Sequence, residues 1–476
     1  MNELLTMSAK ALAAAIRQGR ASSREVVDAH IDRIREVNPR LNALVFDRYE
    51  EARAEALAAD ERLAREGPDD LPPLHGVPCT IKEAIALKGM PHTSGLVARK
   101  GVLATRDAPT VARWRAAGAI PLGVTNTSEL CMWMESSNRV YGRTGNAYDP
   151  TRTAGGSSGG EGAMVGSGCA PFGLGADIGG SIRMPAFFNG VFGHKATGGL
   201  IPGTGNFPTP HGDAWRLLST GPLCRKAEDL GLLVRLLVGP DGQDPGCEPG
   251  ELLDPEAVRA SDLTVYDCRE RLLLPVEGEL LEAQERAARA LERRGATVRR
   301  TALPALRAAL ELWSARMHAA GGPSYAELLG EGTAIATGRE LAKWLLGRSE
   351  HTLPSLGLAA VEKVPALFPG RIATMVERAR RLQGELRELL GDRGVLLFPS
   401  HTRVAPKHHR PFLPPVHWAY TGIFNALEAP STQVPLGLDR RGLPLGVQVV
   451  AGHGRDHLGL AVARMLEEDF GGWVSP

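Results

Sequence analysis

The chain has 476 residues, of which 43% are hydrophobic and 23% charged, as in a globular protein with a large buried core. Lys and Arg (55) balance Asp and Glu (54) to a net charge of +1, and no extended basic block occurs, so a nucleic-acid partner is not indicated. The six cysteines are scattered without a C-x-x-C pair, which favours reduced thiols over a disulfide framework or a zinc site.

The N-terminal part of the chain predicts helices. Ser8 can cap a helix over residues 9–17, and Ser22-x-x-Glu25 is a capping box that opens a second helix. We expect this second helix to end before Pro39, because proline cannot continue a helix without losing a hydrogen bond. A third helix, rich in Ala, Glu and Arg, completes this region.

The sequence carries no pattern that favours export or a membrane span. The first residues lead into a charged amphipathic stretch, and no apolar stretch with a cleavage site follows. The longest apolar runs, such as residues 230–238, are far shorter than the roughly 20 residues of a spanning helix. We therefore expect a cytoplasmic protein without a transmembrane segment.

The next region predicts a sheet with helices on both faces. Residues 76–81 form an apolar strand pattern after Pro73, and this strand places Lys82 at its end. A helix over residues 110–118 leads into the apolar run 120–124. This alternation of strand and helix is typical of a sheet that is covered on both sides.

A polar loop over residues 135–158 is long enough to indicate a functional role. Small residues over 159–168 then suit a helix that packs closely against the sheet. The Gly- and Pro-rich segment 239–255 reads as a linker, after which a second section of strands and helices begins at about residue 263. In this section we expect helices near 277–295, 304–320, 337–347, 370–391 and 456–468, and strands at 395–398 and 445–450.

Two glycine loops carry serines, Gly-Gly-Ser-Ser-Gly-Gly over residues 155–160 and Gly-Gly-Ser-Ile-Arg over 179–183. Ser157 and Ser181 are 24 residues apart, and Lys82 lies 75 residues before Ser157. A lysine that is buried and therefore neutral can take the proton of an attacking serine through an intervening hydroxyl. Flanking glycines let backbone N–H groups face the oxyanion that develops on the substrate. The pattern predicts a serine hydrolase that cleaves amides.

These motifs resemble the amidase signature family, and the resemblance extends over nearly the whole chain. It implies an α/β/α sandwich in which a large, mixed, twisted sheet is covered by helices on both faces. It also implies one amidase domain over residues 1–476, with N-terminal helices in 1–70, a signature core in about 72–238 and a second section in about 256–476.

The resemblance assigns a Ser-Ser-Lys group. Ser181 corresponds to the nucleophile, Lys82 to the final base, and Ser157 to the bridging serine, which the family holds after a cis peptide bond and which also contacts substrate. The implied oxyanion hole consists of the backbone amides of Ile178, Gly179, Gly180 and Ser181. By the same resemblance, Cys131 lies in a stretch that contributes to the acyl pocket and is expected to contact the substrate. The residues themselves predict three supports: Ser158 beside the bridging serine, and Asp177 and Arg183, whose opposite charges flank the nucleophile loop and are expected to form an ion pair that fixes it. No metal or organic cofactor is implied.

Residues 173–183, 192–195 and the C-terminal tail resemble the fatty acid amide hydrolase branch of this family, which implies a small-molecule amide as substrate. The branch suggests long-chain N-acyl amides, and aryl amides or short nylon-type oligomers stay open. Two alternatives stay open. One is the A-type glutaminase subunit of a glutamyl-tRNA amidotransferase, which releases ammonia from glutamine, and the other is a noncatalytic binding protein with the same fold. The sequence leaves open whether helices within 303–365 cap an acyl channel, and whether the protein is a homodimer.

The segment 155–159 also satisfies the Gly-x-Ser-x-Gly elbow of α/β-hydrolases, in which the serine follows a buried strand. Residues 146–152 precede it and are too polar for such a strand, so we do not expect an elbow.

Overall fold

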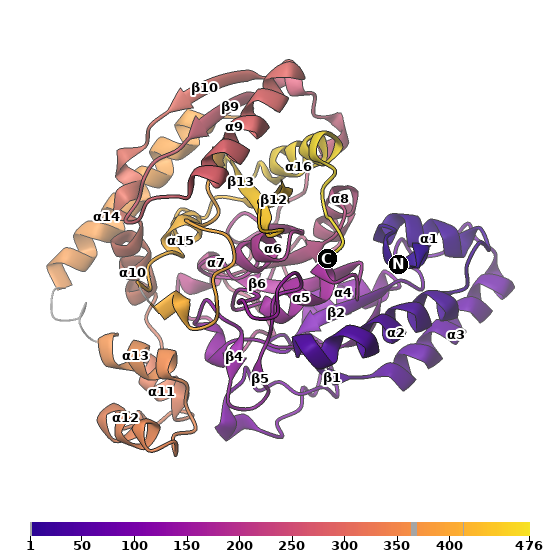
Figure 1. Cartoon of the computed structure of the whole chain (residues 1–476), viewed down its shortest axis with the longest axis horizontal. Coiled ribbons are helices and arrows are strands. Elements are labelled where there is room, and N and C mark those ends of the chain that lie inside the picture. Colours follow the sequence, from indigo (N-terminus) through magenta and orange to yellow (C-terminus); the bar gives the residue numbers. More distant parts are fainter. Residues whose placement is uncertain (1, 363–368, 413) are drawn as a thin grey trace.

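The computed structural model describes residues 2–362, 369–412 and 414–476. A mixed sheet of eleven strands runs through the molecule in the order β1-β3-β2-β6-β8-β7-β12-β13-β11-β9-β10, and helices pack on its faces (Figure 1). The predicted α/β fold around a large mixed sheet is confirmed. Pairing is parallel for β3-β2-β6 and for β11-β9-β10, and antiparallel elsewhere.

The strands of the large sheet are β1 (Leu44–Asp47), β2 (Pro78–Lys82), β3 (Ile120–Thr125), β6 (Phe172–Asp177), β7 (Phe192–Lys195), β8 (Ser219–Cys224), β9 (Thr264–Cys268), β10 (Thr297–Thr301), β11 (Gly394–Phe398), β12 (Ser431–Leu438) and β13 (Pro444–Ala451). A separate hairpin is formed by β4 (Ser137–Asn138) and β5 (Gly142–Arg143).

The helices are α1 (Ala9–Arg17), α2 (Ser23–Leu41), α3 (Tyr49–Glu66), α4 (Pro109–Ala116), α5 (Gly159–Gly166), α6 (Arg183–Phe188), α7 (Ala214–Leu217), α8 (Ala227–Arg235), α9 (Gly278–Arg293), α10 (Ala309–Ala320), α11 (Tyr325–Leu329), α12 (Thr337–Leu345), α13 (Leu353–Val361), α14 (Pro369–Leu390), α15 (Ala419–Ala426) and α16 (Asp456–Phe470). The short 3-10 helices include η3 (Glu129–Cys131) and η6 (Pro304–Ala308).

The end of α2 differs from the prediction. The helix passes through Pro39 and ends at Leu41, and the capping box at its start is present as expected. Pro39 lies on the exposed side of the last turn, where the lost hydrogen bond faces solvent. The Asn38 side chain accepts hydrogen bonds from the backbone N–H groups of Ala43 and Leu44 and so ties down the chain that follows the helix.

The strands in the middle of the sheet are buried on both faces. Every residue of β2, β3, β6, β7 and β8 is buried, so these strands lack the alternation of apolar and polar residues that marks a half-exposed strand. Several of them contain Gly or Pro, residues that are depleted in strands. For this reason the pattern does not predict β7 or β8, although it does predict β2 and β3.

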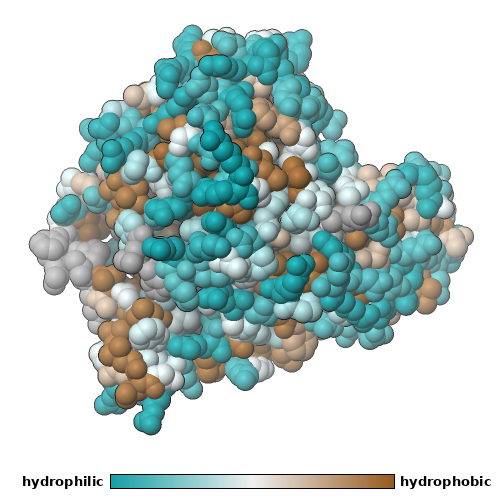
Figure 2. Space-filling model, viewed as in Figure 1, coloured by the Kyte–Doolittle hydropathy of each residue, from teal (hydrophilic) through white to brown (hydrophobic). Residues whose placement is uncertain are grey.

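Helices α11, α12 and α13 form a separate lobe at the lower left of Figure 1, which we call the α11–α13 lobe (residues 325–361). Apolar side chains gather on its surface in Figure 2, and Leu345 and Leu346 are 79% and 70% exposed. Among the described helices, none combines the length and the apolar character that crossing a bilayer requires.

Candidate active site

Lys82 and Ser157 meet in the interior of the protein. Lys82 is the last residue of β2, and its Nζ donates a hydrogen bond to Ser157 Oγ at 2.6 Å. Each of the two residues is only 1% exposed. The peptide bond between Gly156 and Ser157 is cis, as the family resemblance implies.

Ser181 lies in a loop between β6 and α6, which we call the Ser181 loop (residues 178–182). The Ser158 N–H donates to the carbonyl of Ser181 at 3.1 Å and so joins this loop to the loop of Ser157. Ser158 Oγ also exchanges hydrogen bonds of 3.3 Å with the backbone of Ala176 at the end of β6. The two serine-bearing loops are therefore held in contact by their backbones.

Gly180 occupies a position that no other residue fits. Its φ of +122° lies in the region that favours glycine, and a Cβ there would lie 2.0 Å from Thr421 Oγ1. Of the four amides predicted to form the oxyanion hole, that of Gly180 donates a hydrogen bond to Asp177 Oδ1 at 2.7 Å. This amide is directed at a carboxylate of the protein.

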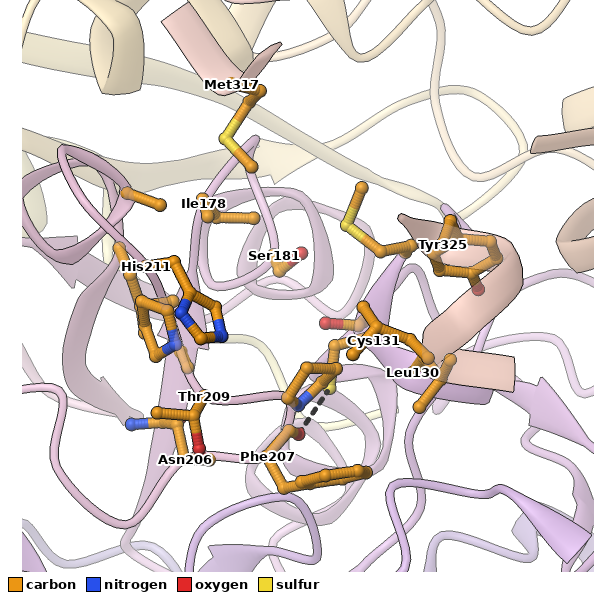
Figure 3. A pocket seen from close by; sticks show the side chains of 18 of the residues that line it. Leu130, Cys131, Ile178, Ser181, Asn206, Phe207, Thr209, His211, Met317 and Tyr325 are labelled. Atoms are coloured by element: carbon orange, nitrogen blue, oxygen red, sulfur yellow. Dashed lines mark hydrogen bonds between the residues drawn. The ribbon is translucent and has the colours of Figure 1, made fainter. Parts of the chain in front are cut away.

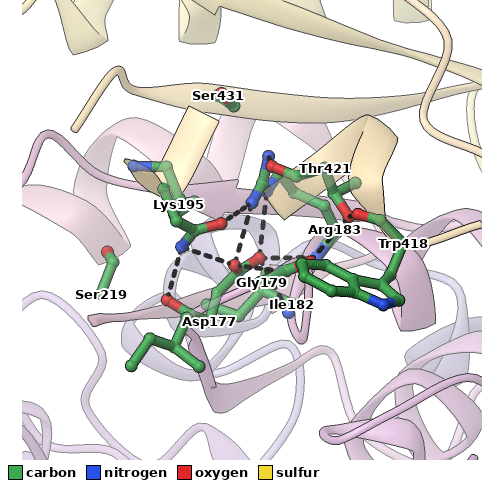
Figure 4. A network of polar contacts seen from close by, with 12 residues as sticks. Asp177, Gly179, Ile182, Arg183, Lys195, Ser219, Trp418, Thr421 and Ser431 are labelled. Carbon is green, nitrogen blue, oxygen red and sulfur yellow. Dashed lines mark hydrogen bonds and ion pairs between the residues drawn. The ribbon is translucent and has the colours of Figure 1, made fainter. Parts of the chain in front are cut away.

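Asp177 and Arg183, which flank the Ser181 loop in the sequence, form the expected ion pair (Figure 4). Arg183 Nη2 is 2.9 Å from Asp177 Oδ1 and Arg183 Nε is 3.0 Å from Asp177 Oδ2, with both residues fully buried. Burial alone would raise the pKa of the Asp177 carboxyl, but the Arg183 charge and its hydrogen bonds hold that pKa well below its usual range. The pair links the two ends of the loop.

Side chains from the C-terminal section also hold the Ser181 loop, and the sequence patterns do not identify them. Trp313 on α10 donates from Nε1 to the carbonyl of Ile178 at 2.7 Å, and Thr421 Oγ1 donates to the carbonyl of Gly179 at 2.9 Å. Asn425 Nδ2 donates to the backbone carbonyl of Asp177 at 2.9 Å. The partners in each contact lie far apart in the chain, so no local motif signals them.

Two cavities meet at Ser181. The larger has a volume of about 550 Å³, lies beside α10, α13 and the start of α15, and is lined by Trp133, Leu310, Trp313, Leu353, Leu358 and Trp418 among others. The smaller has a volume of about 220 Å³ and contains Lys82, Ser157, Asn206, Thr209, His211 and Tyr325 (Figure 3). Both cavities are lined by Cys131, Met132, Ile178 and Ser181.

Cys131 lies at the junction of the two cavities, at the end of η3. Its backbone has a φ of 60°, and the preceding Leu130 has a φ of 50°. The Cys131 thiol lies 3.2 Å from Ser94 Oγ and 3.4 Å from Thr127 Oγ1. Cys131 thus lines both cavities, and its contact with an acyl group stays a prediction.

Glu161 is a buried carboxyl near this site that the sequence patterns do not single out. It lies in the first turn of α5 and is fully buried. Its side chain accepts hydrogen bonds from Thr80 Oγ1 at 2.6 Å and from Thr125 Oγ1 at 2.7 Å. Burial raises the pKa of this carboxyl to about 8, although the two hydroxyls and the Lys82 charge act in the opposite direction.

The structure thus brings most of the predicted residues to one place. Lys82, Ser157, Ser181, Ile178 and Cys131 line the smaller cavity, and Gly179 lines the larger one. The three predicted supporting residues, Ser158, Asp177 and Arg183, are fully buried.

Known proteins resemble this chain over its full length. Fatty-acid amide hydrolase 2-B from Danio rerio is 47% identical over 486 residues, which cover 100% of this chain and 91% of that protein. A glutamyl-tRNA(Gln) amidotransferase subunit from Methylococcus capsulatus is 30% identical over 475 residues, covering 96% of each chain. The solved structure of 6-aminohexanoate cyclic dimer hydrolase with its substrate is 27% identical and has a TM-score of 0.81, covering 98% of this chain and 97% of that one.

The family model described as Amidase matches residues 25–460, which include both serine loops and Lys82. The chain therefore belongs to the amidase family.

Proposed function

We propose that the protein hydrolyses carboxylic amides through an acyl-enzyme on Ser181, with Ser157 as the bridging serine and Lys82 as the base. The observation that carries the proposal is the buried contact of 2.6 Å between Lys82 Nζ and Ser157 Oγ, in a cavity that Ser181 also lines. A neutral amine in this position can receive a proton from Ser157 while Ser157 takes the proton of Ser181.

The reaction balances with these groups alone. Ser181 Oγ attacks the carbonyl carbon, its proton passes to Ser157 Oγ, and the Ser157 proton passes to Lys82 Nζ. When the tetrahedral intermediate collapses, the C–N bond breaks and the proton returns by the same path to the leaving nitrogen. Water then attacks the acyl-enzyme, and the acid leaves as Ser181 regains its proton. General acid-base help of this kind contributes on the order of 10²–10⁴-fold.

The backbone amides of the Ser181 loop donate hydrogen bonds to the oxyanion of the intermediate. Because the Gly180 N–H already donates to Asp177, we assign the main contacts to the amides of Ile178, Gly179 and Ser181. Ser158, Asp177 and Arg183 support the loop without contacting the substrate, since all three are fully buried and none is among the residues that line the two cavities.

The two cavities suggest how the substrate lies. The leaving nitrogen must receive its proton from Ser157, so the amine portion is assigned to the smaller cavity, where Lys82 and Ser157 lie. The acyl chain then enters the larger cavity, whose lining is mostly apolar and aromatic. Cys131 contacts the substrate at the junction. Long-chain N-acyl amides fit this division, and the name of the Danio rerio relative points to the same class.

The serine roles can be tested by labelling. A fluorophosphonate reagent should modify Ser181 in the intact protein, and the Ser181→Ala variant should lose both the label and the amidase activity. Ser157→Ala should lose most activity, because the proton path is broken. A label that is found only on Ser157 would revive the α/β-hydrolase elbow.

The substrate class needs a separate assay. Fatty acid amides of increasing acyl length with one fixed leaving group should show kcat/KM rising with length. A flat dependence on length would leave an amidase whose acyl preference differs from the one proposed.

A glutaminase is the second candidate function, because the amidotransferase relative matches almost the whole chain. The isolated protein should release little ammonia from glutamine and should hydrolyse N-acyl amides without a partner. The opposite result would favour the glutaminase, and a protein with no reactive serine would favour a noncatalytic role.

We also propose that residues 1–476 form one amidase domain. The pairing of β7 with β12 supports this, because it joins the signature core to the C-terminal section within one sheet. A cytoplasmic location and a homodimer stay predictions.

A further inference from the structure

Glu161 and Lys82 lie on the same face of the sheet. Side chains two residues apart on a strand point the same way, so Thr80 and Lys82 share a face of β2. Thr125 on β3 is the register partner of Lys82, and directly paired residues of neighbouring strands also share a face. Glu161 accepts hydrogen bonds from both Thr80 and Thr125, and its carboxyl therefore lies against the patch of sheet from which Lys82 projects.

The sheet leaves room for this carboxyl. Gly173 on β6 is the register partner of Thr80, and a Cβ on Gly173 would lie 1.7 Å from Glu161 Oε2. Any side chain at residue 173 would displace the carboxyl. Three neighbouring strands thus accommodate the carboxyl: β2 and β3 each donate a hydroxyl hydrogen bond to it, and β6 leaves space for it because Gly173 has no side chain.

Other buried carboxyls nearby are better compensated. Asp177 has the guanidinium of Arg183, and Glu83 accepts four hydrogen bonds, from the N–H and hydroxyl of Thr93, the N–H of Ser94 and the hydroxyl of Tyr141. Glu161 makes two hydrogen bonds within the described residues, both to hydroxyls. Burial of an ionised carboxylate is unfavourable unless a charge or several donors compensate it.

The charged residue that acts on Glu161 is Lys82, on β2. Lys82 favours its ionised form electrostatically, and the buried thiol of Cys79, also on β2, interacts with Glu161 as a second titratable group. The neighbouring β3 and β6 face the carboxyl with Thr125 and Gly173, which carry no charge.

We propose that Glu161 is a positioning residue that supplies the buried counter-charge for the ammonium formed on Lys82 when Lys82 takes up the seryl proton. This inference rests on the proposed function of Lys82 as the base. The carboxylate exchanges no proton with the substrate. Burial raises the pKa of this carboxyl to about 8, so it acts as the counter-charge above that pH, where its ionised form stabilises the ammonium of the transition state through the low-dielectric interior.

The variant Glu161→Gln tests the inference, because the amide can still accept from Thr80 and can donate to Thr125. Without the negative charge, the ammonium that forms on Lys82 has no buried counter-charge and is less stable. We expect the plateau of kcat/KM for an N-acyl amide to fall on the order of 10- to 1000-fold, since a nearby opposite charge is worth one to three pKa units, each a factor of ten. We also expect the acid limb of the pH profile to move to lower pH.

Asp229→Asn is the matched control. Asp229 is also fully buried, burial raises its pKa to about 7, and its carboxylate accepts hydrogen bonds from the N–H groups of Ala9 and Lys10 at the start of α1. Loss of this carboxyl changes the buried charge of the protein far from the Lys82 cavity. The pH profile of Asp229→Asn should match that of the wild type.

Thr125→Val provides a second variant in case Glu161→Gln does not fold. It keeps the carboxyl but removes a hydroxyl that favours its ionised form, so the acid limb should move in the same direction by a smaller amount. Folding is checked by thermal unfolding and by fluorophosphonate labelling of Ser181.

A folded Glu161→Gln variant with the wild-type acid limb would overturn the inference, even if its plateau were lower, because a merely structural residue changes the plateau alone. If only Thr125→Val folds, an unmoved acid limb overturns the inference and a moved limb supports it. Failure of the proposed function looks different, since Lys82→Ala would then keep its activity.

Discussion

The Lys82 amine donates to the Ser157 hydroxyl across 2.6 Å, and each of the two residues is 1% exposed. A buried ammonium would need a compensating partner, whereas a buried amine with one hydroxyl partner is accommodated more easily. The pair is therefore arranged for proton transfer between two groups that are almost completely buried.

Lys82→Ala should lose at least about 100-fold in kcat/KM for an N-acyl amide, because removal of a general base costs on the order of 10²–10⁴-fold. Lys82→Arg should be equally impaired, since arginine keeps the positive charge but stays protonated and cannot accept the Ser157 proton. Steady-state kinetics on variants with unchanged far-UV circular dichroism check both. Near wild-type turnover in Lys82→Ala would remove this residue from the mechanism.

The larger cavity can be narrowed at Gly357, which lines it from α13 and has open space where a Cβ would lie. Gly357→Phe should reduce kcat/KM for long acyl chains more than tenfold and leave short acyl chains nearly unchanged, because only a long chain reaches this part of the cavity. Gly384→Phe is the control, since Gly384 on α14 is exposed, also has open space and lies outside the cavity lining. Equal losses for short and long chains would argue against an acyl chain in this cavity.

Arg183→Met should destabilise the protein by about 3–5 kcal/mol, because it leaves the buried Asp177 carboxylate without its partner. Adding Asp177→Asn to this variant should restore part of the lost stability. Urea unfolding measures the free energies. Arg381→Met provides the comparison, since the exposed pair of Arg381 and Glu385 on α14 should contribute less than about 1 kcal/mol. Additive losses in the double variant would contradict a direct coupling between Asp177 and Arg183.

Acid should destabilise the protein well above the pH at which carboxylates are protonated. Burial lowers the pKa of His30 to about 3, so the folded state holds this ring neutral while the unfolded state protonates it near its usual pKa. The unfolded state then binds more protons between about pH 6.5 and pH 3, and the free energy of unfolding falls as the pH falls through this window. Stability contributed by the neutral ring is fully present above this window.

The variant His30→Gln isolates this effect because glutamine does not titrate. Its melting temperature should fall less between pH 7 and pH 5 than that of the wild type, although its value at pH 7 is lower. Parallel decreases in the two proteins would show that His30 does not contribute to acid lability.

Local patterns predict a large share of this fold. The capping box of α2, the helices α9, α14 and α16, and the strands β2, β3, β11 and β13 follow from periodicity and from helix-start signals, with errors of a few residues at their ends. The exception at Pro39 arises because a proline in the last exposed turn costs little. Strands β7 and β8 escape prediction because burial on both faces removes the alternation on which strand patterns depend.

By itself the sequence predicted the chemistry of the site, because Ser157 and Ser181 stand in glycine-rich loops, Lys82 ends an apolar strand, and the spacing of the three resembles that of the amidase family. The tertiary structure alone decided how these residues are supported. The Glu161 carboxyl lies against β2, β3 and β6, on the face of the sheet from which Lys82 projects. Hydrogen bonds from the C-terminal section hold the Ser181 loop and the Asp177 carbonyl before it, and they come from Trp313, Thr421 and Asn425. Contacts between distant segments depend on the order of the strands in the sheet and on which side chains of each strand point to the same face. Local sequence patterns predict neither of these.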